Sequence, residues 1–510
     1  MIRHVSQVSA LTLASRVLGF LRDVLIARHL GAGLASDAFF IAFKLPNFFR
    51  RLFAEGAFSA AFVPLYTAAR NRDPAGHEAR RLAEEALAAL VTILLGLTIL
   101  VQIALPVLIY LLAPGFAEDA AKRELAVALT RLTFPYLLCI SVVALFSGVL
   151  NAHERFAAPA AAPVLLNLTF ITALLIGADS PLITARRLAV AVSVAGIVQL
   201  VWLVLAAGRA GIRLRFRRPR WSRRLAHLVS LMLPVALGAG ITQVNLLIDV
   251  MLASFLPDGS LSFLFYADRL NQLPLGVIGV AVGTTLLPGL SRSFARADVK
   301  GAERLLAEAL TIILALALPA ALALIIVPDI LIAGLFERGA FDAADTRATA
   351  AALMAYASGL PAYMLTKALV PVFYAEKDTR TPTRLALIAL GANFALNLAL
   401  IGPLAHVGLA LATSLAAWLQ TGLLAHRLFR RRRLSPALIR RLPIRPVAAA
   451  SMVMAAALAG LRILFRSWPV GTVMAVAITV GTGLAVYALT AWLLGLHRRI
   501  LRPQRPTPPA

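Results

Sequence analysis

The sequence contains little of what a disulfide-stabilised or soluble protein uses. Cys139 is the only cysteine among 510 residues, which excludes an internal disulfide and a cysteine-rich metal site. Charged residues make up only 15% of the chain and aromatic residues 7%, whereas a soluble domain averages about 25% charged residues. The motif G-x-x-x-x-G-K-[ST] is absent, so the chain has no recognisable ATP-binding loop.

Hydrophobic residues are abundant and occur in long runs. They make up 60% of the chain, and its mean hydropathy is +0.83. Runs such as 87–112, 310–335 and 448–464 approach or exceed the roughly 20 residues that a helix needs to cross a bilayer. We therefore predict an all-α polytopic membrane protein.

The basic residues lie mainly between these runs. Lysine and arginine number 50 against 24 acidic residues, for a formal net charge of +26. This distribution follows the positive-inside pattern of membrane proteins and argues against nucleic acid as a partner. Two arginine pairs, at 186–187 and at 462 and 466, are exceptions to the pattern.

Hydropathy predicts about fourteen transmembrane helices with both termini in the cytoplasm, and we identify no removable signal peptide. The predicted spans cover residues 5–30, 36–66, 83–112, 124–150, 160–178, 186–208, 227–256, 262–290, 304–335, 347–374, 382–402, 405–427, 446–465 and 470–495.

An internal repeat divides these spans into two parallel six-helix halves. Its landmarks are the pairs 23–30 and 249–256, 63–64 and 287–288, and 149–159 and 372–382. Parallel repeats are a transporter architecture in which a central cavity lies between the halves. We predict an N-terminal half at 1–220, a C-terminal half at 221–435, and two additional helices with a basic cytoplasmic tail at 436–510.

The first span carries ionisable residues at bilayer depth. Ser15, Arg16, Gly19, Arg22 and Asp23 fall within about 120° of one another on a helical wheel. A charge at the bilayer centre costs at least ~2.5–3.5 kcal/mol, so such residues usually face protein or a wet cavity. We expect a cavity-lining face. The alternative is that these side chains extend to a membrane surface.

The second span carries a stripe of charges interrupted by Pro46. The wheel aligns the side chains of Asp37, Lys44, Arg51 and Glu55 and leaves Arg50 on another face. Pro46 kinks the helix and makes the later register unreliable, so geometry does not choose between Arg50 and Arg51. Asp37 also fits a simpler role as a carboxylate at a helix N-terminus.

The eighth span, the repeat partner of the second, carries Ser262, Asp268 and Arg269. The last two either pair with each other or line the second side of a polar cavity. Arginine holds phosphate oxygens in a bidentate way and stays charged. The repeated cations therefore favour a phosphate-bearing cargo.

Three segments together resemble the MurJ (MviN) family of lipid II flippases, in the multidrug/oligosaccharidyl-lipid/polysaccharide exporter superfamily. They are SRVLGFLRD at 15–23, SDAFFIAFKLPNFFRRLFAEGAFSAAFVP at 36–64 and YADRLNQLPLGVIG at 266–279. The resemblance implies a transporter, not an enzyme, of the bacterial inner membrane. It would move undecaprenyl-pyrophosphate-linked disaccharide-pentapeptide to the outer leaflet for peptidoglycan synthesis, by alternating access.

The resemblance also assigns residues. It places substrate-binding arginines at Arg16, Arg22, Arg50 and Arg269, so it selects Arg50 over Arg51, and it marks Asp37 as an important acid. It also implies that the last two helices hold the polyprenyl tail. From the charge pattern itself, we expect further residues to line or gate the cavity together with Asp37: Ser15, Asp23, Lys44, Arg51, Glu55, Ser262 and Asp268. Implied partners are lipid II, membrane lipids and the cell-wall elongation or division machinery, with the chain itself a monomer.

Two other functions remain open. One is an exporter of the same superfamily that moves another lipid-linked oligosaccharide or a drug. The other is a membrane enzyme acting on polyprenyl pyrophosphate, against which the scattered positions of the eight histidines argue.

The energy source is the least defined feature of the sequence. We expect no cofactor, and coupling to Na⁺, H⁺ or the membrane potential. Asp249, Asn393, Asn397 and Thr413 form a possible cation site of hard oxygen ligands. The alternative is that these amides only cross-link helices.

Overall fold

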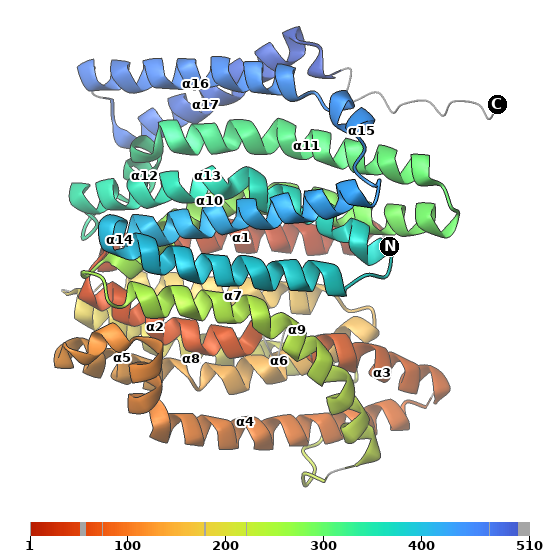
Figure 1. Cartoon of the computed structure of the whole chain (residues 1–510). Helices are drawn as coiled ribbons and strands as arrows, with labels where there is room; N and C mark the ends of the chain where they lie inside the picture. Colours follow the sequence, from red (N-terminus) through yellow and green to blue (C-terminus); the bar gives the residue numbers. More distant parts are fainter. Residues whose placement is uncertain are drawn as a thin grey trace. The chain divides into compact units, whose positions relative to one another are not determined.

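The structure is a computed structural model. It describes residues 2–51, 58–73, 75–177, 180–220, 222–468 and 470–497, without side chains at 2–5, 237–244 and 277–285. Every regular element within these ranges is a helix (Figure 1). The predicted all-α class is confirmed.

The chain divides into two compact units. Unit 1 comprises Met1–Ser262 together with Arg338–Phe341, and unit 2 comprises Phe263–Glu337 and Asp342–Ala510. The predicted division at residue 220 concerns the sequence repeat and stays a prediction.

Unit 1 contains the helices that carry most of the predicted site. They are α1 (Ile2–Leu30), α2 (Leu34–Phe49), α3 (Ser59–Arg72), α4 (His77–Leu112), the 3-10 turn η2 (Pro114–Ala117), α5 (Ala120–Thr133), α6 (Tyr136–Ala152), α7 (Ala157–Leu175), α8 (Pro181–Arg209) and α9 (Arg223–Ala253).

Unit 2 contains the remaining helices, apart from the first turn of α10. They are α10 (Ser260–Ala295), α11 (Val299–Ile326), α12 (Pro328–Phe336), α13 (Ala343–Ala375), α14 (Arg380–Arg430), α15 (Pro436–Arg441), α16 (Ile444–Ser467) and α17 (Thr472–Leu493).

Nine helical segments in the described part of the chain are long and apolar enough to cross a membrane. The protein is therefore a multi-pass membrane protein, and the number fourteen stays a prediction. Bends divide several predicted spans: Pro135 separates α5 from α6, and Val327 separates α11 from α12. Within α14, Ala405 has φ 47° and ψ −129°, a break at the boundary predicted between residues 402 and 405.

The turn after α6 and the turn after α13 have the same backbone geometry. Glu154 and Lys377 have left-handed φ angles of 59° and 62°. In each turn the following N–H donates to the carbonyl five residues earlier at 2.9 Å, Arg155 to Leu150 and Asp378 to Phe373. These positions lie 223 residues apart, the offset of the predicted repeat. The turns at Ala297 and Arg432 have the same geometry, so the repeat stays a prediction.

Each unit has an apolar core of its own. In unit 1 the core lies between α2, α4, α5 and α6 and includes Leu45, Leu105 and Phe134. In unit 2, α16 and α17 lie side by side next to α11 (Figure 1). Hydrophobic burial of this kind contributes about 25 cal/mol per Å² in water. Between helices in a bilayer, close packing and polar contacts contribute more.

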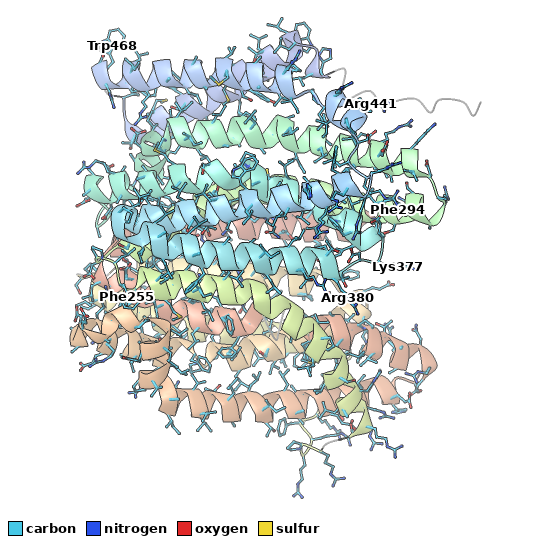
Figure 2. The ribbon with its side chains drawn as sticks, viewed as in Figure 1. Phe255, Phe294, Lys377, Arg380, Arg441 and Trp468 are labelled. Atoms are coloured by element: carbon cyan, nitrogen blue, oxygen red, sulfur yellow. The ribbon has the colours of Figure 1, made fainter. Side chains whose placement is uncertain are left out.

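Basic turns gather at one end of unit 2. Figure 2 shows Lys377, Arg380 and Arg441 at the same end as Phe294, and Trp468 at the opposite end of α16. Arg433 lies at this end as well, because its guanidinium is 5.0 Å from the Phe294 ring centroid. This end corresponds to the side that the loop charges assign to the cytoplasm.

Candidate functional site

A buried polar network on α1 extends to α7. The Arg22 guanidinium donates to Asp23 Oδ1 from Nε at 3.0 Å and from Nη2 at 2.7 Å. Its Nη1 donates to Asn167 Oδ1 at 3.0 Å. Arg22 is 8% exposed and Asp23 3%, so the ion pair is held within the unit.

Asn167 also fixes the rest of this face of α1. Its Nδ2 donates to the backbone oxygen of Ser15 at 2.9 Å. A Cβ added at Gly19 would lie 3.5 Å from the same Nδ2. Ser15 and Arg22 therefore bind Asn167, and Gly19 faces it, as their common face on the wheel leads one to expect. Arg16, on the edge of that face, is exposed.

The burial of Arg22 has a chemical consequence. Removing a charge from water is expensive unless the charge is paired and hydrogen-bonded. Asp23, Asn167 and the ring of Phe170, whose centroid lies 5.4 Å from the guanidinium, provide that compensation. Two oxygens of a phosphate match the same fork of donors. The binding of an anion by Arg22 stays a prediction.

The end of α2 departs from ideal helical geometry. The helix contains Pro46, and residues 50 and 51 continue it in π-helical form. Arg50 Nε donates to Asn47 Oδ1 at 3.1 Å. Arg50 is half-buried and Arg51 exposed. A π-helical turn shifts the register, which explains why an ideal wheel could not choose between them.

The second span carries two further predicted residues. Lys44 is half-buried on α2. Glu55 lies outside the described residues. Their proposed cavity-lining role stays a prediction.

Asp37 binds the start of α10. Its Oδ2 accepts the N–H of Gly259 at 2.8 Å, and its Oδ1 accepts the N–H of Ser262 at 2.9 Å and the hydroxyl at 2.6 Å. The Ser262 hydroxyl lies 2.8 Å from that of Ser36. The first N–H groups of a helix have no partner within it and favour a negative charge. Asp37 therefore caps a helix that begins more than 220 residues later.

The same end of unit 1 contains close backbone contacts. The N–H of Ala340 donates to the oxygen of Arg28 at 2.8 Å. At Gly31, with φ +62°, an added Cβ would lie 2.3 Å from the Ala340 oxygen. Lys122, 5% exposed, pairs with Asp258. The turns after α1, α9 and α12 are thus joined at this end.

In unit 2, α10 carries the other predicted cation. The Arg269 guanidinium lies 4.6 Å from the Phe265 ring centroid. Asp268 accepts a hydrogen bond from Gln272, one turn later. Both charged residues are half-buried. The predicted site arginines are therefore divided between the two units, and their sharing of one cavity stays a prediction.

Three of the four predicted cation ligands lie together in unit 2. Asn397 Nδ2 donates to Asn393 Oδ1 at 3.1 Å, and Asn393 Nδ2 lies 3.4 Å from Thr413 Oγ1. Asp249 belongs to unit 1. Among the described residues, no group of three or more histidine, cysteine, aspartate or glutamate side chains is placed to hold a metal ion.

Sequence reasoning did not assign partners for several polar residues that the structure brings together. Asn167 was not among the predicted site residues, although an amide in an apolar span is itself unusual. Arg462, an exception to the charge pattern, donates to Asp329 Oδ2 from Nε at 3.1 Å and from Nη2 at 2.9 Å. Its Nη1 donates to the oxygen of Ile326, at the break between α11 and α12.

These features define the class of protein. Long apolar helices cross the membrane, and charged side chains are paired inside the helix bundle. Such residues are rare in transmembrane segments and are typical of transport pathways. The structure is that of a polytopic α-helical membrane transporter.

Comparison with known proteins identifies the family. The model of the lipid II flippase MurJ family matches residues 26–479. A probable lipid II flippase MurJ of Rhizobium tropici is 41% identical over 98% of this chain and 96% of its own length. The lipid II flippase MurJ of Burkholderia cenocepacia is 38% identical over 83% of the chain and 82% of its own length. The chain belongs to the lipid II flippase MurJ family.

Solved structures agree with this assignment. A lipid II flippase MurJ in an inward closed conformation has a TM-score of 0.81 and 27% identity, covering 97% of this chain and 99% of its own. An inward-facing multidrug transporter of the MATE family, in the MOP superfamily, has a TM-score of 0.67 at 17% identity, over 83% and 96%. The second likeness shows a shared fold.

Proposed function

We propose that this chain is a lipid II flippase. It moves undecaprenyl-pyrophosphate-linked disaccharide-pentapeptide from the cytoplasmic to the outer leaflet for peptidoglycan synthesis. The observation that carries this proposal is the likeness along nearly the whole length of a named flippase, 98% of this chain and 96% of the relative. The arginines of α1, α2 and α10 support it, because a pyrophosphate needs cationic donors.

The arginines divide into two kinds by their surroundings. Arg16 is exposed, and Arg50 and Arg269 are half-buried, so we assign them to direct contact with the pyrophosphate. Arg22 already binds Asp23 and Asn167, so it takes the anion by exchange of acceptors. Such an exchange keeps the buried guanidinium hydrogen-bonded throughout.

Alternating access gives the Asp37 contact a role. The Asp37 bonds to Gly259 and Ser262 hold one end of unit 1 together in this conformation. Outward opening would have to break them, because rocking of one repeat against the other separates such contacts. We assign Glu55 and Asp268 to gating contacts of the same kind.

The remaining assignments follow from the charge pattern and the family. We place the chain in the cytoplasmic membrane with both termini inside, as a monomer that works with the elongation or division machinery. Its basic turns gather at one end of unit 2, which supports this orientation. Na⁺, H⁺ or the membrane potential would drive transport, with Asp249, Asn393, Asn397 and Thr413 as the possible cation site.

The test is replacement of the native flippase in a bacterium depleted of it. The wild-type chain should restore outer-leaflet lipid II, measured by its accessibility to an external probe. Arg16→Ala and Arg269→Ala should express normally and fail to restore it. Arg213→Ala, an exposed arginine between α8 and α9, is the matched control. Full rescue by both site variants would overturn the arginine mechanism, and no rescue by the expressed wild-type chain would overturn the proposed substrate.

A further inference from the structure

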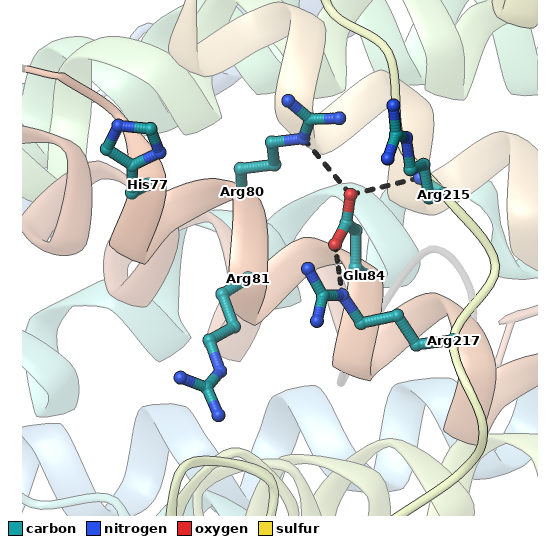
Figure 3. A pocket seen from close by; sticks show the side chains of 6 residues that line it. All are labelled: His77, Arg80, Arg81, Glu84, Arg215 and Arg217. Atoms are coloured by element: carbon teal, nitrogen blue, oxygen red, sulfur yellow. Dashed lines mark hydrogen bonds and ion pairs between the residues drawn. The ribbon is translucent and has the colours of Figure 1, made fainter.

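A basic cavity lies at the N-terminal end of α4, in unit 1 and apart from the helices assigned to the substrate. Its volume is about 320 Å³, and it is lined by His77, Arg80, Arg81, Glu84, Arg215 and Arg217. Figure 3 shows the first four on α4 and the last two on the segment 211–220, which joins α8 to α9 and is here called the linker.

Glu84 holds the linker against α4. Its Oε1 accepts Arg80 Nε at 3.1 Å and the backbone N–H of Arg215 at 3.0 Å, and its Oε2 accepts Arg217 Nε (Figure 3). Glu84 is 0% exposed. Next to it, Glu85 accepts Arg81 Nε at 3.2 Å. The two acids are therefore occupied in fixing the arginines in place.

The arginines keep donors for a further ligand. Arg80, Arg81 and Arg217 use only Nε in these bonds, and Arg215 uses only its backbone N–H. Within the described part of the chain, their terminal amino groups have no acceptor. Four arginines against one glutamate give the lining a net formal charge of +3 with His77 neutral. Paired amino groups of this kind bind phosphate oxygens.

The position of the cavity relative to the bilayer indicates which phosphate-bearing molecule it would meet. The apolar run of α4 begins at Leu87, directly after Glu84 and Glu85. At about 1.5 Å per residue, the residues from His77 to Glu84 span roughly 12 Å just outside the hydrocarbon core. That is the depth of lipid headgroups.

The linker has the composition of a segment at a membrane surface. Phe216 is 62% exposed between arginines. Exposed aromatic side chains are typical of the headgroup level, and basic clusters there attract anionic lipids. A site for a soluble phosphate would not need the exposed aromatic group.

We propose that the cavity between α4 and the linker binds the phosphate of an anionic phospholipid headgroup. The lipid joins α4 to the linker between the two repeats. The guanidinium groups of Arg81 and Arg215 donate to the phosphate. Arg80 and Arg217 donate to it through their terminal amino groups while their Nε atoms stay bonded to Glu84. This site is independent of the proposed transport function, and its test needs no flipping assay.

The test compares two double variants of the full chain in detergent. Arg81→Gln with Arg215→Gln removes cavity donors whose guanidinium groups do not bind Glu84. Arg213→Gln with Arg218→Gln removes two exposed arginines of the same linker that are outside the cavity lining. Both variants lose the same charge. Bound phosphatidylglycerol is measured by native mass spectrometry, with phosphatidylcholine of the same acyl chains as the neutral comparison.

The site variant should bind phosphatidylglycerol roughly tenfold more weakly than wild type, because it loses two arginines at a charged surface. The control should change by less than about twofold, since its arginines lie outside the cavity. Equal affinity of the site variant and wild type, or equal losses in both variants, would overturn the site.

Two further arms complete the test. If the site variant does not fold, Arg215→Gln alone and Arg215→Lys are measured; weaker binding by the first and recovery by the second support the site, and wild-type binding by Arg215→Gln overturns it. Inorganic phosphate is the last probe. If it displaces phosphatidylglycerol at equal concentration, the cavity takes soluble phosphate and the lipid assignment is wrong.

Discussion

Asp37 and Ser262 are joined by two hydrogen bonds that end on one carboxylate oxygen. The Ser262 N–H and hydroxyl both donate to Asp37 Oδ1, at 2.9 and 2.6 Å. Both residues are almost completely buried, at 1% and 0% exposure. The contact joins α2 to the start of α10. Substituting either residue tests directly whether the contact holds this end of unit 1 together.

Asp37→Asn should lower the thermal midpoint of the purified protein. The amide has one accepting oxygen, so a hydrogen bond to a charged group, worth about 1.5–3 kcal/mol, is lost. Ser262→Ala should cost less, about 1 kcal/mol, because the backbone bonds to Asp37 stay. The double variant should lose less than the two singles together, because the residues share one contact. Additive losses would contradict the direct coupling.

Gly19 should accept alanine and reject leucine. An added Cβ meets Asn167 Nδ2 at 3.5 Å, an ordinary contact, whereas a longer side chain must displace Asn167. Displacement leaves Arg22 Nη1 without its acceptor, at a cost of about 1–3 kcal/mol. Thermal unfolding in detergent measures both. Gly96→Leu on α4, where nothing lies within 4 Å of an added Cβ, is the control and should unfold like wild type.

Glu84→Gln should release the linker. Two arginine side chains and one backbone N–H bind this carboxylate, and a neutral amide replaces only part of that set. Trypsin should then cleave at the linker arginines several-fold faster, because cleavage follows local opening. Glu78→Gln is the control, since its pair with Arg224 is 3.4 Å long and half-exposed. Equal cleavage rates in both variants would mean that Glu84 does not hold the linker.

Acidification should destabilise the turn between α13 and α14 over the pH range in which Asp378 becomes protonated. Hydrogen bonds from Thr381, and then the Arg431 guanidinium, lower the pKa of Asp378 from 3.8 to about 2. A carboxylate whose pKa is lower in the folded than in the unfolded protein stabilises the fold at pH values above the unfolded pKa. This stabilisation is lost as the pH falls through the folded pKa. The contribution is thus complete above about pH 4 and disappears toward pH 2.

Asp378→Asn should flatten the decline of the thermal midpoint between those two pH values. Arg431→Gln should flatten it less, because the Thr381 bonds, which come first among the causes, remain. The measurement is the midpoint as a function of pH in detergent. A variant curve parallel to wild type across this range would contradict the assignment.

Local sequence patterns predicted most of the helices but not which residues their polar side chains bind. The wheel placed Ser15, Gly19 and Arg22 on one face; Ser15 and Arg22 bind Asn167, and Gly19 faces it. The only sequence signal for Asn167 was an amide in an apolar span, and nothing there linked it to Arg22, 145 residues away. Beyond Pro46 the wheel did not choose between Arg50 and Arg51, and a π-helical segment changes the angle per residue there.

Hydropathy and charge in the sequence were sufficient to determine the class and most helix limits, because a bilayer acts on each segment through its own composition. The family resemblance came from the motif segments 15–23, 36–64 and 266–279. The repeat was predicted from the sequence and stays a prediction. Only the tertiary structure decided which distant groups bind these charged side chains: Asn167 for the buried Arg22, Asp329 for the half-exposed Arg462, and the α10 N-terminus for the buried Asp37. The physical reason is that a buried charge is satisfied by whichever donor or acceptor packing brings within about 3 Å, and distance along the chain has no part in that choice.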